Sequence, residues 1–226
     1  MNKYKDTELR YASAPYFQDS EDITILLLGA GGIGSNTAFA LSRSIKSTII
    51  VVDYDIVETH NTGTQFFIKN SIGKSKVDGL STTLTKFATS AKFQYLNSKT
   101  TGDIISPITI TAFDNMEARK LSFEAWCNLP DREIFIDGRL IADQYTVYTV
   151  LPGNEDRYRE TLFDDADIPA APCTYKQTSH FGLLIGARIT NIMLNFITNK
   201  LAKEDICRIP FSITEYGSLI LTKIEK

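Results

Sequence analysis

A short apolar segment that ends at a glycine-rich loop constrains the fold more than any other feature of this sequence. Residues 23–28 read ITILLL, and residues 29–34 follow as G-A-G-G-I-G, which fits the pattern G-x-G-x-x-G. A continuous apolar run of this length is typical of a strand buried on both faces of a parallel sheet. Residues 31–43 then have helical periodicity. The segment therefore predicts a strand, a tight glycine turn and a helix whose first N–H groups can bind a phosphate.

A second apolar run, residues 47–52, ends at Asp53, which follows Gly34 by about 20 residues. A carboxylate in this place can accept hydrogen bonds from the hydroxyls of a ribose. Strand, loop, helix, strand and acid in this order predict a site for an adenine nucleotide. These features alone do not distinguish NAD(P), FAD and ATP.

The rest of the chain alternates between predicted helices and strands. Helices are predicted over residues 74–88, 116–127 and about 182–201. Strands are predicted over residues 93–96, 108–113, 133–136, 144–151 and twice within 209–224. This order predicts an α/β fold, with a Rossmann-like, doubly wound and mostly parallel sheet and additional antiparallel strands at the C-terminal end.

We predict a single domain over residues 1–226, because the chain has no internal repeat and no linker rich in Pro, Gly or Ser. Its predicted parts outside the central core are an N-terminal arm (1–22), a crossover loop (152–181), a long apolar helix (182–203) and C-terminal strands (208–226). The helix carries Arg188, Asn191 and Asn195, which favours a buried or interface helix over a membrane span. We therefore expect no membrane association.

The charge balance and the cysteines narrow the class of protein. Twenty-four basic and 27 acidic side chains leave a net charge of −3, which argues against a global nucleic-acid surface. Cys127, Cys173 and Cys207 are odd in number and form no C-x-x-C, so neither a disulfide framework nor a four-thiolate zinc site is expected. Free thiols and an N-terminus without an apolar signal segment predict a cytoplasmic protein.

The residues after the second strand carry a more specific pattern. Residues 52–67 read VDYDIVETHNTGTQFF, a G-K-S-K element follows at 73–76, and F-D-N stands at 113–115. Together with the glycine loop, this ordered set resembles the ThiF/MoeB superfamily, the ATP-dependent activators of ubiquitin-like and sulfur-carrier proteins. That superfamily carries GxGGxGS, D-x-D-x-V, N-x-x-R-Q, G-x-x-K and a later D-N at a strand end. The resemblance extends from about residue 10 to about residue 201, and NAD-dependent dehydrogenases do not share the set.

The resemblance implies roles for particular residues. Asp53 would bind the ribose, Lys76 the triphosphate, and Asp114 a magnesium ion or the reacting phosphates. The remaining residues implied to hold or line the nucleotide are Gly29, Gly31, Gly32, Gly34, Asp55, Asn61 and Gln65. The implied reaction is attack by a C-terminal glycine carboxylate on the α-phosphate of ATP, which gives an acyl-adenylate and pyrophosphate. Cations are needed there because both reactants are anionic.

The sequence departs from the superfamily where cations are expected. Thr64 stands at the arginine position of N-x-x-R-Q, and Ser13 replaces a second arginine near the N-terminus. The loss of one positioned cation typically lowers a rate on the order of a hundredfold. Lys69, Lys74 and Arg139 are candidate replacements. Arg139 is favoured because it follows a predicted strand end, whereas the two lysines read as solvated surface residues.

Cys173 is the thiol for which the sequence indicates chemistry. It lies in A-P-C-T, which resembles the catalytic cysteine of ubiquitin-activating enzymes, and Lys176 and His180 are close in sequence. Such a thiol accepts the acyl group as a thioester and must be exposed and partly ionised. A loop cysteine without a role is the alternative. Cys127, by contrast, reads as a core residue.

Three functions compete on these observations. The leading one is adenylation of the C-terminal glycine of a ubiquitin-like or sulfur-carrier protein, with ATP and Mg²⁺. Zinc is not expected, because residues 157–160 read R-Y-R-E where relatives have C-x-x-C. The second is a catalytically degenerate nucleotide-binding scaffold, favoured by the missing arginines. The third, an NAD-dependent oxidoreductase, rests on the glycine loop and Asp53 alone. The resemblance also implies a homodimer, with the apolar helix in the contact.

Overall fold

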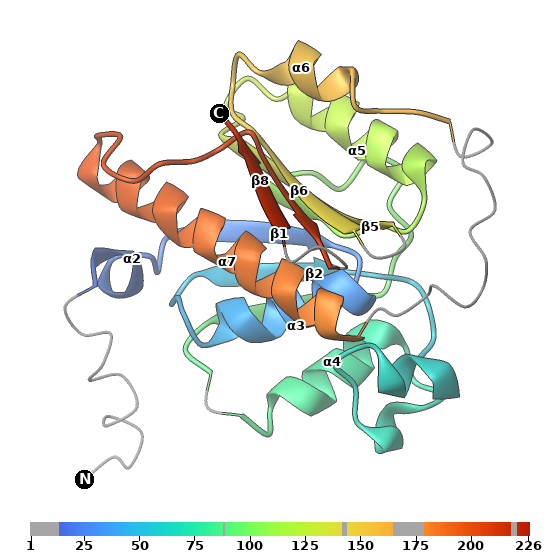
Figure 1. The fold of residues 1–226 in the computed structure, drawn as a ribbon. Helices are drawn as coiled ribbons and strands as arrows, with labels where there is room; N and C mark the ends of the chain where they lie inside the picture. The colour runs from blue at the N-terminus through green and yellow to red at the C-terminus, as the bar shows by residue number, and fades with distance from the viewer. Residues whose placement is uncertain (1–13, 88, 142–143, 165–178, 218–220) are drawn as a thin grey trace, which may run out of the picture.

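A mixed sheet runs through the computed structural model, which describes residues 14–87, 89–141, 144–164, 179–217 and 221–226 (Figure 1). Within these residues the sheet has eight strands in the order β3-β2-β1-β4-β5-β6-β7-β8. The strands are β1 (Thr24–Leu28), β2 (Thr48–Val52), β3 (Lys92–Leu96), β4 (Ile108–Thr111), β5 (Ile134–Ile141), β6 (Gln144–Val150), β7 (Ser212–Tyr216) and β8 (Leu221–Glu225).

The sheet has a parallel half and an antiparallel half. Strands β1 to β5 pair in parallel, and β5 to β8 pair in antiparallel fashion. The central strands β1 and β4 are almost wholly buried, as their continuous apolar runs predict, whereas the edge strand β3 alternates in exposure. The predicted fold class, a doubly wound, mostly parallel α/β sheet with antiparallel C-terminal strands, is confirmed.

Helices cover both faces of the sheet (Figure 1). One face packs against α3 (Gly32–Ser42), α4 (Lys76–Leu84) and α7 (Ser179–Ala202), which share a large apolar core with β1, β2, β4 and β5. The other face packs against α5 (Met116–Cys127) and α6 (Glu155–Arg159), around an aromatic core. Short helices complete the described chain: α2 (Pro15–Gln18), η1 (Thr59–Gly63) and η2 (Lys69–Ser71).

Two glycines bring the long helix α7 against α3. A Cβ atom on Gly182 would lie 2.7 Å from the carbonyl oxygen of Gly32, and one on Gly186 would lie 2.9 Å from the backbone of Asn36. Only glycine permits this separation, so α7 braces the start of the helix that follows the glycine loop. Helix α7 is long and apolar enough to cross a membrane, but 56% of its most apolar stretch is buried inside the fold, which is typical of a core helix.

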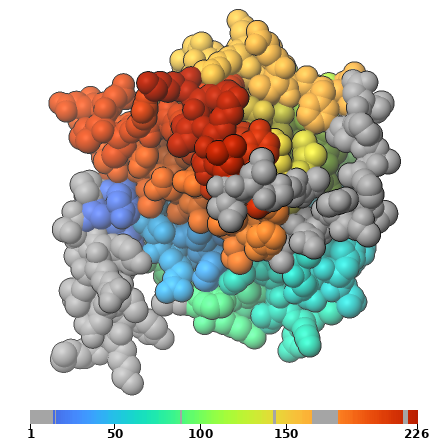
Figure 2. Space-filling view, in the orientation of Figure 1, coloured from blue at the N-terminus to red at the C-terminus, as the bar shows by residue number. Residues whose placement is uncertain are grey.

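The outer surface of α7 keeps exposed apolar side chains, among them Leu183 and Leu184. In the space-filling view α7 and the C-terminal strands form adjoining parts of one surface (Figure 2), and Arg188 of α7 pairs with Glu215 of β7 at 3.2 Å. The homodimer implied by the resemblance stays a prediction.

Several boundaries differ from the sequence predictions. Strand β5 continues to Ile141, five residues beyond its predicted end, because its extension pairs with β6 in a hairpin. Arg139 therefore lies inside a strand and does not follow one. Helix α6 lies within the predicted crossover loop, where five residues are too few to show a periodicity. Helix α4 is shorter than predicted and ends at Leu84.

Candidate functional site

Three strand ends meet beside the glycine loop. Leu28, the last residue of β1, pairs with Val52 at the end of β2 and with Thr111 at the end of β4. The connection that follows β1 crosses one face of the sheet through α3, and the connection that follows β4 crosses the other face through α5. The gap between these two strand ends is therefore the switch point, where doubly wound sheets hold their ligands. Gly29 and Asp53 directly follow two of these strands. The structure thus brings the predicted loop and the predicted acid to one edge of the sheet.

The glycines of the loop serve different physical needs. Gly29 has φ +97°, and a Cβ there would lie 2.8 Å from the carbonyl oxygen of Ala112. A Cβ on Gly34 would lie 1.9 Å from the carbonyl oxygen of Gly29, so this glycine lets α3 pack on the loop. Among the described residues, a Cβ on Gly31 would meet no atom within 4 Å, and one on Gly32 would meet only the Thr64 carbonyl oxygen, at 3.9 Å. Packing therefore requires two of these glycines, and the described residues leave space beside the other two.

Asp53 holds the glycine loop in place by accepting hydrogen bonds from two backbone N–H groups. Its Oδ2 accepts a hydrogen bond from the N–H of Ala30 at 2.7 Å, and its Oδ1 accepts one from the N–H of Asp55 at 2.8 Å. The residue is 9% exposed. A carboxylate has further lone pairs, so two backbone bonds leave acceptor capacity for a ribose hydroxyl.

Lys76 reaches the same corner from the start of α4. Its Nζ lies 2.7 Å from Oδ2 of Asp55, and its N–H donates to the carbonyl oxygen of Asp55 at 2.7 Å. The lysine side chain is 11% exposed and the aspartate 45%. A continuous path of hydrogen bonds therefore connects Ala30, Asp53, Asp55 and Lys76.

The Asn61–Gln65 segment packs over the loop. Asn61 is buried, and its Oδ1 accepts from the N–H of Glu58 at 2.8 Å, which fixes the start of η1. Oε1 of Gln65 is buried and has no hydrogen-bond partner among the described residues. Thr64, between them in this corner, approaches Gly32 through its carbonyl oxygen. The position of the family's arginine therefore borders the glycine loop, and here it carries no charge.

Ser35 is a residue of this corner to which sequence reasoning gave no role. Its hydroxyl donates to the carbonyl oxygen of Gly31 at 2.6 Å and accepts from the N–H of Phe66 at 2.9 Å. It thereby fastens the segment after Gln65 to the glycine loop. Its place directly after Gly34, as the serine of GxGGxGS, is the signal that could have found it.

Asp114 lies in the loop between β4 and α5 and is exposed. Asn115 follows it and caps α5, because its Oδ1 accepts from the N–H of Ala118 at 2.8 Å. An exposed carboxylate at the end of β4 is available to a metal ion or a phosphate-bound cation. The metal-binding role of Asp114 and the ligand roles of the loop glycines, Asp53, Asp55, Asn61, Gln65 and Lys76 stay predictions.

Arg139 is placed differently from its expected role as a replacement cation. Its Nε donates to Asp137 at 2.6 Å, Nη1 donates to the Thr161 carbonyl oxygen at 2.7 Å, and the guanidinium lies over the ring of Tyr148. Arg139 is 6% exposed. Its strand neighbour Gly138 faces Ile33 of α3, so Arg139 points to the opposite side of the sheet. Its guanidinium is engaged in a buried cluster and gives no support to the replacement role.

The remaining candidates are two lysines, Cys127 and residues outside the described part of the chain. Lys69 and Lys74 are exposed, as solvated surface lysines are. Burial raises the pKa of the Cys127 thiol to about 11, and the side chain packs against the aromatic core, in line with a core role. Ser13 and Cys173 lie outside the described residues. Among the described residues, no group of three His, Cys, Asp or Glu side chains could hold a metal ion, and the expected absence of zinc stays a prediction.

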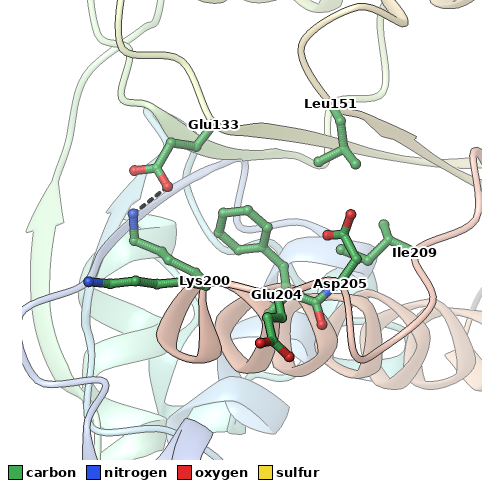
Figure 3. A pocket seen from close by; sticks show the side chains of 9 residues that line it. Glu133, Leu151, Lys200, Glu204, Asp205 and Ile209 are labelled. Carbon is green, nitrogen blue, oxygen red and sulfur yellow. Dashed lines mark hydrogen bonds and ion pairs between the residues drawn. The ribbon is translucent and has the colours of Figure 1, made fainter.

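A hollow of about 380 Å³ lies at the other end of the parallel strands, where β5 begins. Glu133, just before β5, pairs there with Lys200 of α7, and Glu204 and Asp205 line the same space (Figure 3). The hollow is bordered by the start of β5, whereas the glycine loop is at the carboxyl ends of the parallel strands. It is therefore separate from the candidate site.

The fold and this corner define a class: a doubly wound α/β protein with a glycine loop, an aspartate and a lysine at the switch point of its sheet. The ThiF family matches residues 7–217, and the chain belongs to this family. The recognition made from the sequence motifs is confirmed.

Two curated relatives illustrate the similarity. Ubiquitin-like modifier-activating enzyme 5 of Drosophila persimilis is 28% identical over 144 residues, which is 56% of this chain and 37% of that enzyme. The same enzyme of Bombyx mori is 30% identical over 139 residues, which is 54% of this chain and 35% of that enzyme. The chain thus spans about a third of the length of these relatives.

Solved structures share the fold. The crystal structure of E. coli MccB with ATP has a TM-score of 0.71 at 17% identity and covers 100% of this chain and 71% of its own. PaaA has a TM-score of 0.70 at 16% identity and covers 94% of this chain and 66% of its own.

Proposed function

We propose that the chain binds ATP at the glycine loop and adenylates the C-terminal carboxylate of a small ubiquitin-like protein or peptide. Membership of the ThiF family supports this function. Curated relatives are named ubiquitin-like modifier-activating enzymes, and MccB has been crystallised with ATP and with MccA. The observation that carries the proposal is the hydrogen-bonded path from Ala30 through Asp53 and Asp55 to Lys76, which sets a cation beside the loop.

The corner has the properties that a nucleotide triphosphate requires. Helix α3 begins at Gly32 without a side-chain cap from the described residues, so the N–H groups of its first turn would be available to an anion. No described residue fills the space beside Gly31, which would admit a phosphate close to the backbone. Oε1 of Gln65 is a buried acceptor that receives no donor from the described residues, and a donor group of the nucleotide or a water molecule would satisfy it.

In the proposed reaction a carboxylate oxygen of the acyl substrate attacks the α-phosphorus of ATP. A new O–P bond forms, the bond to the oxygen that bridges the α- and β-phosphates breaks, and pyrophosphate leaves with that electron pair. Lys76 would neutralise negative charge that builds up on the phosphates. Asp55 competes for the same ammonium group, so nucleotide binding would exchange a carboxylate partner for a phosphate partner. Asp114 would hold Mg²⁺, which supplies further charge neutralisation.

We propose as acyl substrate a ubiquitin-like or sulfur-carrier protein that ends in glycine, and as state of the enzyme a cytoplasmic homodimer. The exposed apolar side chains Leu183 and Leu184 on α7 support a contact with a second copy. A thioester role of Cys173 is part of the same proposal.

A second candidate function is a nucleotide-binding scaffold without turnover. The specific observation in its favour is Thr64, a neutral residue beside Gly32 at the position of the family's arginine. Arg139 does not compensate for this loss, because its guanidinium is bound to Asp137 and Thr161.

The test is ATP–pyrophosphate exchange with two acyl substrates: a small β-grasp protein that ends in Gly-Gly, and a short peptide with a free carboxyl terminus. Amidated forms of both are the matched substrates without a nucleophile. We expect exchange that requires the free carboxylate, and a loss of at least about a hundredfold in Lys76→Met. Lys74→Met removes an exposed lysine two residues away and should leave the rate unchanged. Tight ATP binding without exchange for either substrate would instead support the scaffold.

A further inference from the structure

The Asp114 side chain has little support of its own. The carboxylate is exposed, and its one hydrogen bond with a described side chain is accepted by Oδ1 from Nδ2 of Asn115, at 3.5 Å. Such a distance is at the limit for a hydrogen bond. The direction in which this carboxylate points is therefore set by the backbone on either side of it.

Arg119 holds that backbone on both sides. It lies on the first turns of α5, and its guanidinium reaches back to the loop. Nη2 donates to the carbonyl oxygen of Phe113 at 2.8 Å, and Nη1 donates to the carbonyl oxygen of Asn115 at 3.2 Å. These two carbonyl groups flank Asp114. Arg119 is 4% exposed, so its guanidinium is largely shielded from water, and both bonds are partly buried. A planar guanidinium can serve several acceptors at once, which a lysine ammonium cannot do in the same geometry.

Asp137 fixes the plane of Arg119. Its Oδ1 accepts from Nε of Arg119 at 2.6 Å and from the hydroxyl of Thr111 at 3.0 Å. Its Oδ2 accepts from Nε of Arg139 at 2.6 Å and from the hydroxyl of Tyr158 at 2.8 Å. The carboxylate is fully buried, and its strand, β5, is paired on both sides. Four donors from β4, α5, β5 and α6 therefore hold this carboxylate in one orientation.

We propose that Arg119 is a positioning residue of the adenylation site, which aims Asp114 through the carbonyl groups of Phe113 and Asn115, and that Asp137 orients Arg119. The inference rests on the proposed function, in which Asp114 holds Mg²⁺. According to this inference, Asp137 and the side chains that it binds affect metal binding by Asp114, although Asp137 does not contact the Asp114 carboxylate.

Arg119→Lys tests the inference in the full-length chain. The lysine keeps the charge opposite Asp137 but cannot bond both carbonyl groups. We expect ATP binding in EDTA to stay within about twofold of the wild type. The tightening of ATP binding by Mg²⁺ should weaken at least about tenfold, as is typical when support for a metal ligand is removed. Calorimetric titration of ATP with EDTA and with MgCl₂ measures both, and the exchange reaction gives the Mg²⁺ concentration for half-maximal rate.

Arg132→Lys is the matched control. Arg132 also pairs with a carboxylate, Glu155 at 2.9 Å, and also donates to a backbone carbonyl oxygen, that of Leu129 at 3.2 Å. It lies just before β5, at the end of the parallel strands opposite to the glycine loop. Its replacement should change the melting temperature without changing the effect of Mg²⁺ on ATP binding.

The outcomes separate the inference from the proposed function. An unchanged Mg²⁺ effect in Arg119→Lys, with or without a lower melting temperature, overturns the positioning role. Absence of exchange in the wild type overturns the adenylation reaction, while the calorimetric comparison still decides the role of Arg119. Wild-type ATP binding that is indifferent to Mg²⁺ overturns the metal-binding role of Asp114 and the positioning role of Arg119 with it. If Arg119→Lys does not fold, Tyr158→Phe removes one bond to Asp137 and should weaken the Mg²⁺ effect about twofold to threefold, in the same direction.

Discussion

Two buried aspartates stand at the carboxyl ends of the parallel strands, and they are held in opposite ways. Asp53, after β2, accepts from two backbone N–H groups and retains 9% exposure. Asp137, near the end of the parallel part of β5, accepts from four side chains, two of them guanidinium groups, and is fully buried. The first is placed to organise a loop that borders open space. The second is closed off and acts through the residues that it orients.

The difference teaches that a carboxylate at a strand end need not be a ligand residue. Backbone donors leave Asp53 with free acceptor capacity on the open side of the loop. The donors around Asp137 come from four elements and satisfy it completely. Its pKa also reflects this setting: burial alone would raise it, but Arg119 and Arg139 hold it below its ordinary value.

The largest contrast is expected from charge removal at the two positions. Asp137→Asn leaves two buried guanidinium groups without a counter-charge and should lower the free energy of unfolding by about 3–5 kcal/mol. Asp53→Asn keeps one good acceptor for a backbone N–H and should lower it by about 1–2 kcal/mol. Urea unfolding of both variants measures the difference. Equal losses would remove the distinction between the two sites.

The decrease in the free energy of unfolding at acid pH should depend on Asp137. Because its folded pKa lies below the unfolded value of about 3.9, its stabilisation is complete above about pH 5 and is lost as the pH falls toward the folded pKa. Free energies of unfolding between pH 6 and pH 2.5 should therefore fall more steeply in the wild type than in Asp137→Asn. Parallel curves for the two proteins would contradict this.

Glycine substitutions separate packing from ligand access within the open corner. Gly34→Ala sets a Cβ 1.9 Å from a carbonyl oxygen and should lower stability by about 1–3 kcal/mol. The added Cβ of Gly31→Ala meets no described residue within 4 Å, and Gly31 has an ordinary φ of −76°, so stability should change by less than about 0.5 kcal/mol. ATP affinity should nevertheless fall at least about tenfold in Gly31→Ala, because its methyl group fills the space proposed for a phosphate. Thermal unfolding and ATP titration measure the two effects.

Thr64→Arg, like Gly31→Ala, is expected to change stability very little. Thr64 is partly exposed beside Gly32, so an arginine can be accommodated with a stability change below about 0.5 kcal/mol. It restores a cation at the family's position and should raise the ATP–pyrophosphate exchange rate about tenfold or more. Thr62→Arg, in the same segment, is the control for added charge alone. An equal gain in both variants would show a general electrostatic effect.

Many elements in the parallel half of the sheet could be predicted from the local sequence pattern. The run before Gly29, the glycine spacing and Asp53 predicted β1, the loop, α3 and β2, and helix α5 has the predicted bounds, with Asn115 as its cap. These features depend on residues close together in sequence. Local pattern failed at Arg139, because Asp-Gly before it resembles a strand end and pairing with β6 continues the strand.

The sequence by itself determined the family and the fold class, and it predicted residues of the glycine corner, because glycine, aspartate and lysine stand there at fixed spacings in one segment of the chain. Only the tertiary structure decided which charges meet. The partners of Asp137 come from positions 111, 119, 139 and 158, and nothing in their spacing marks them as neighbours. Buried charges must find donors wherever the packed elements bring them, so such a cluster is defined by the fold and not by a motif.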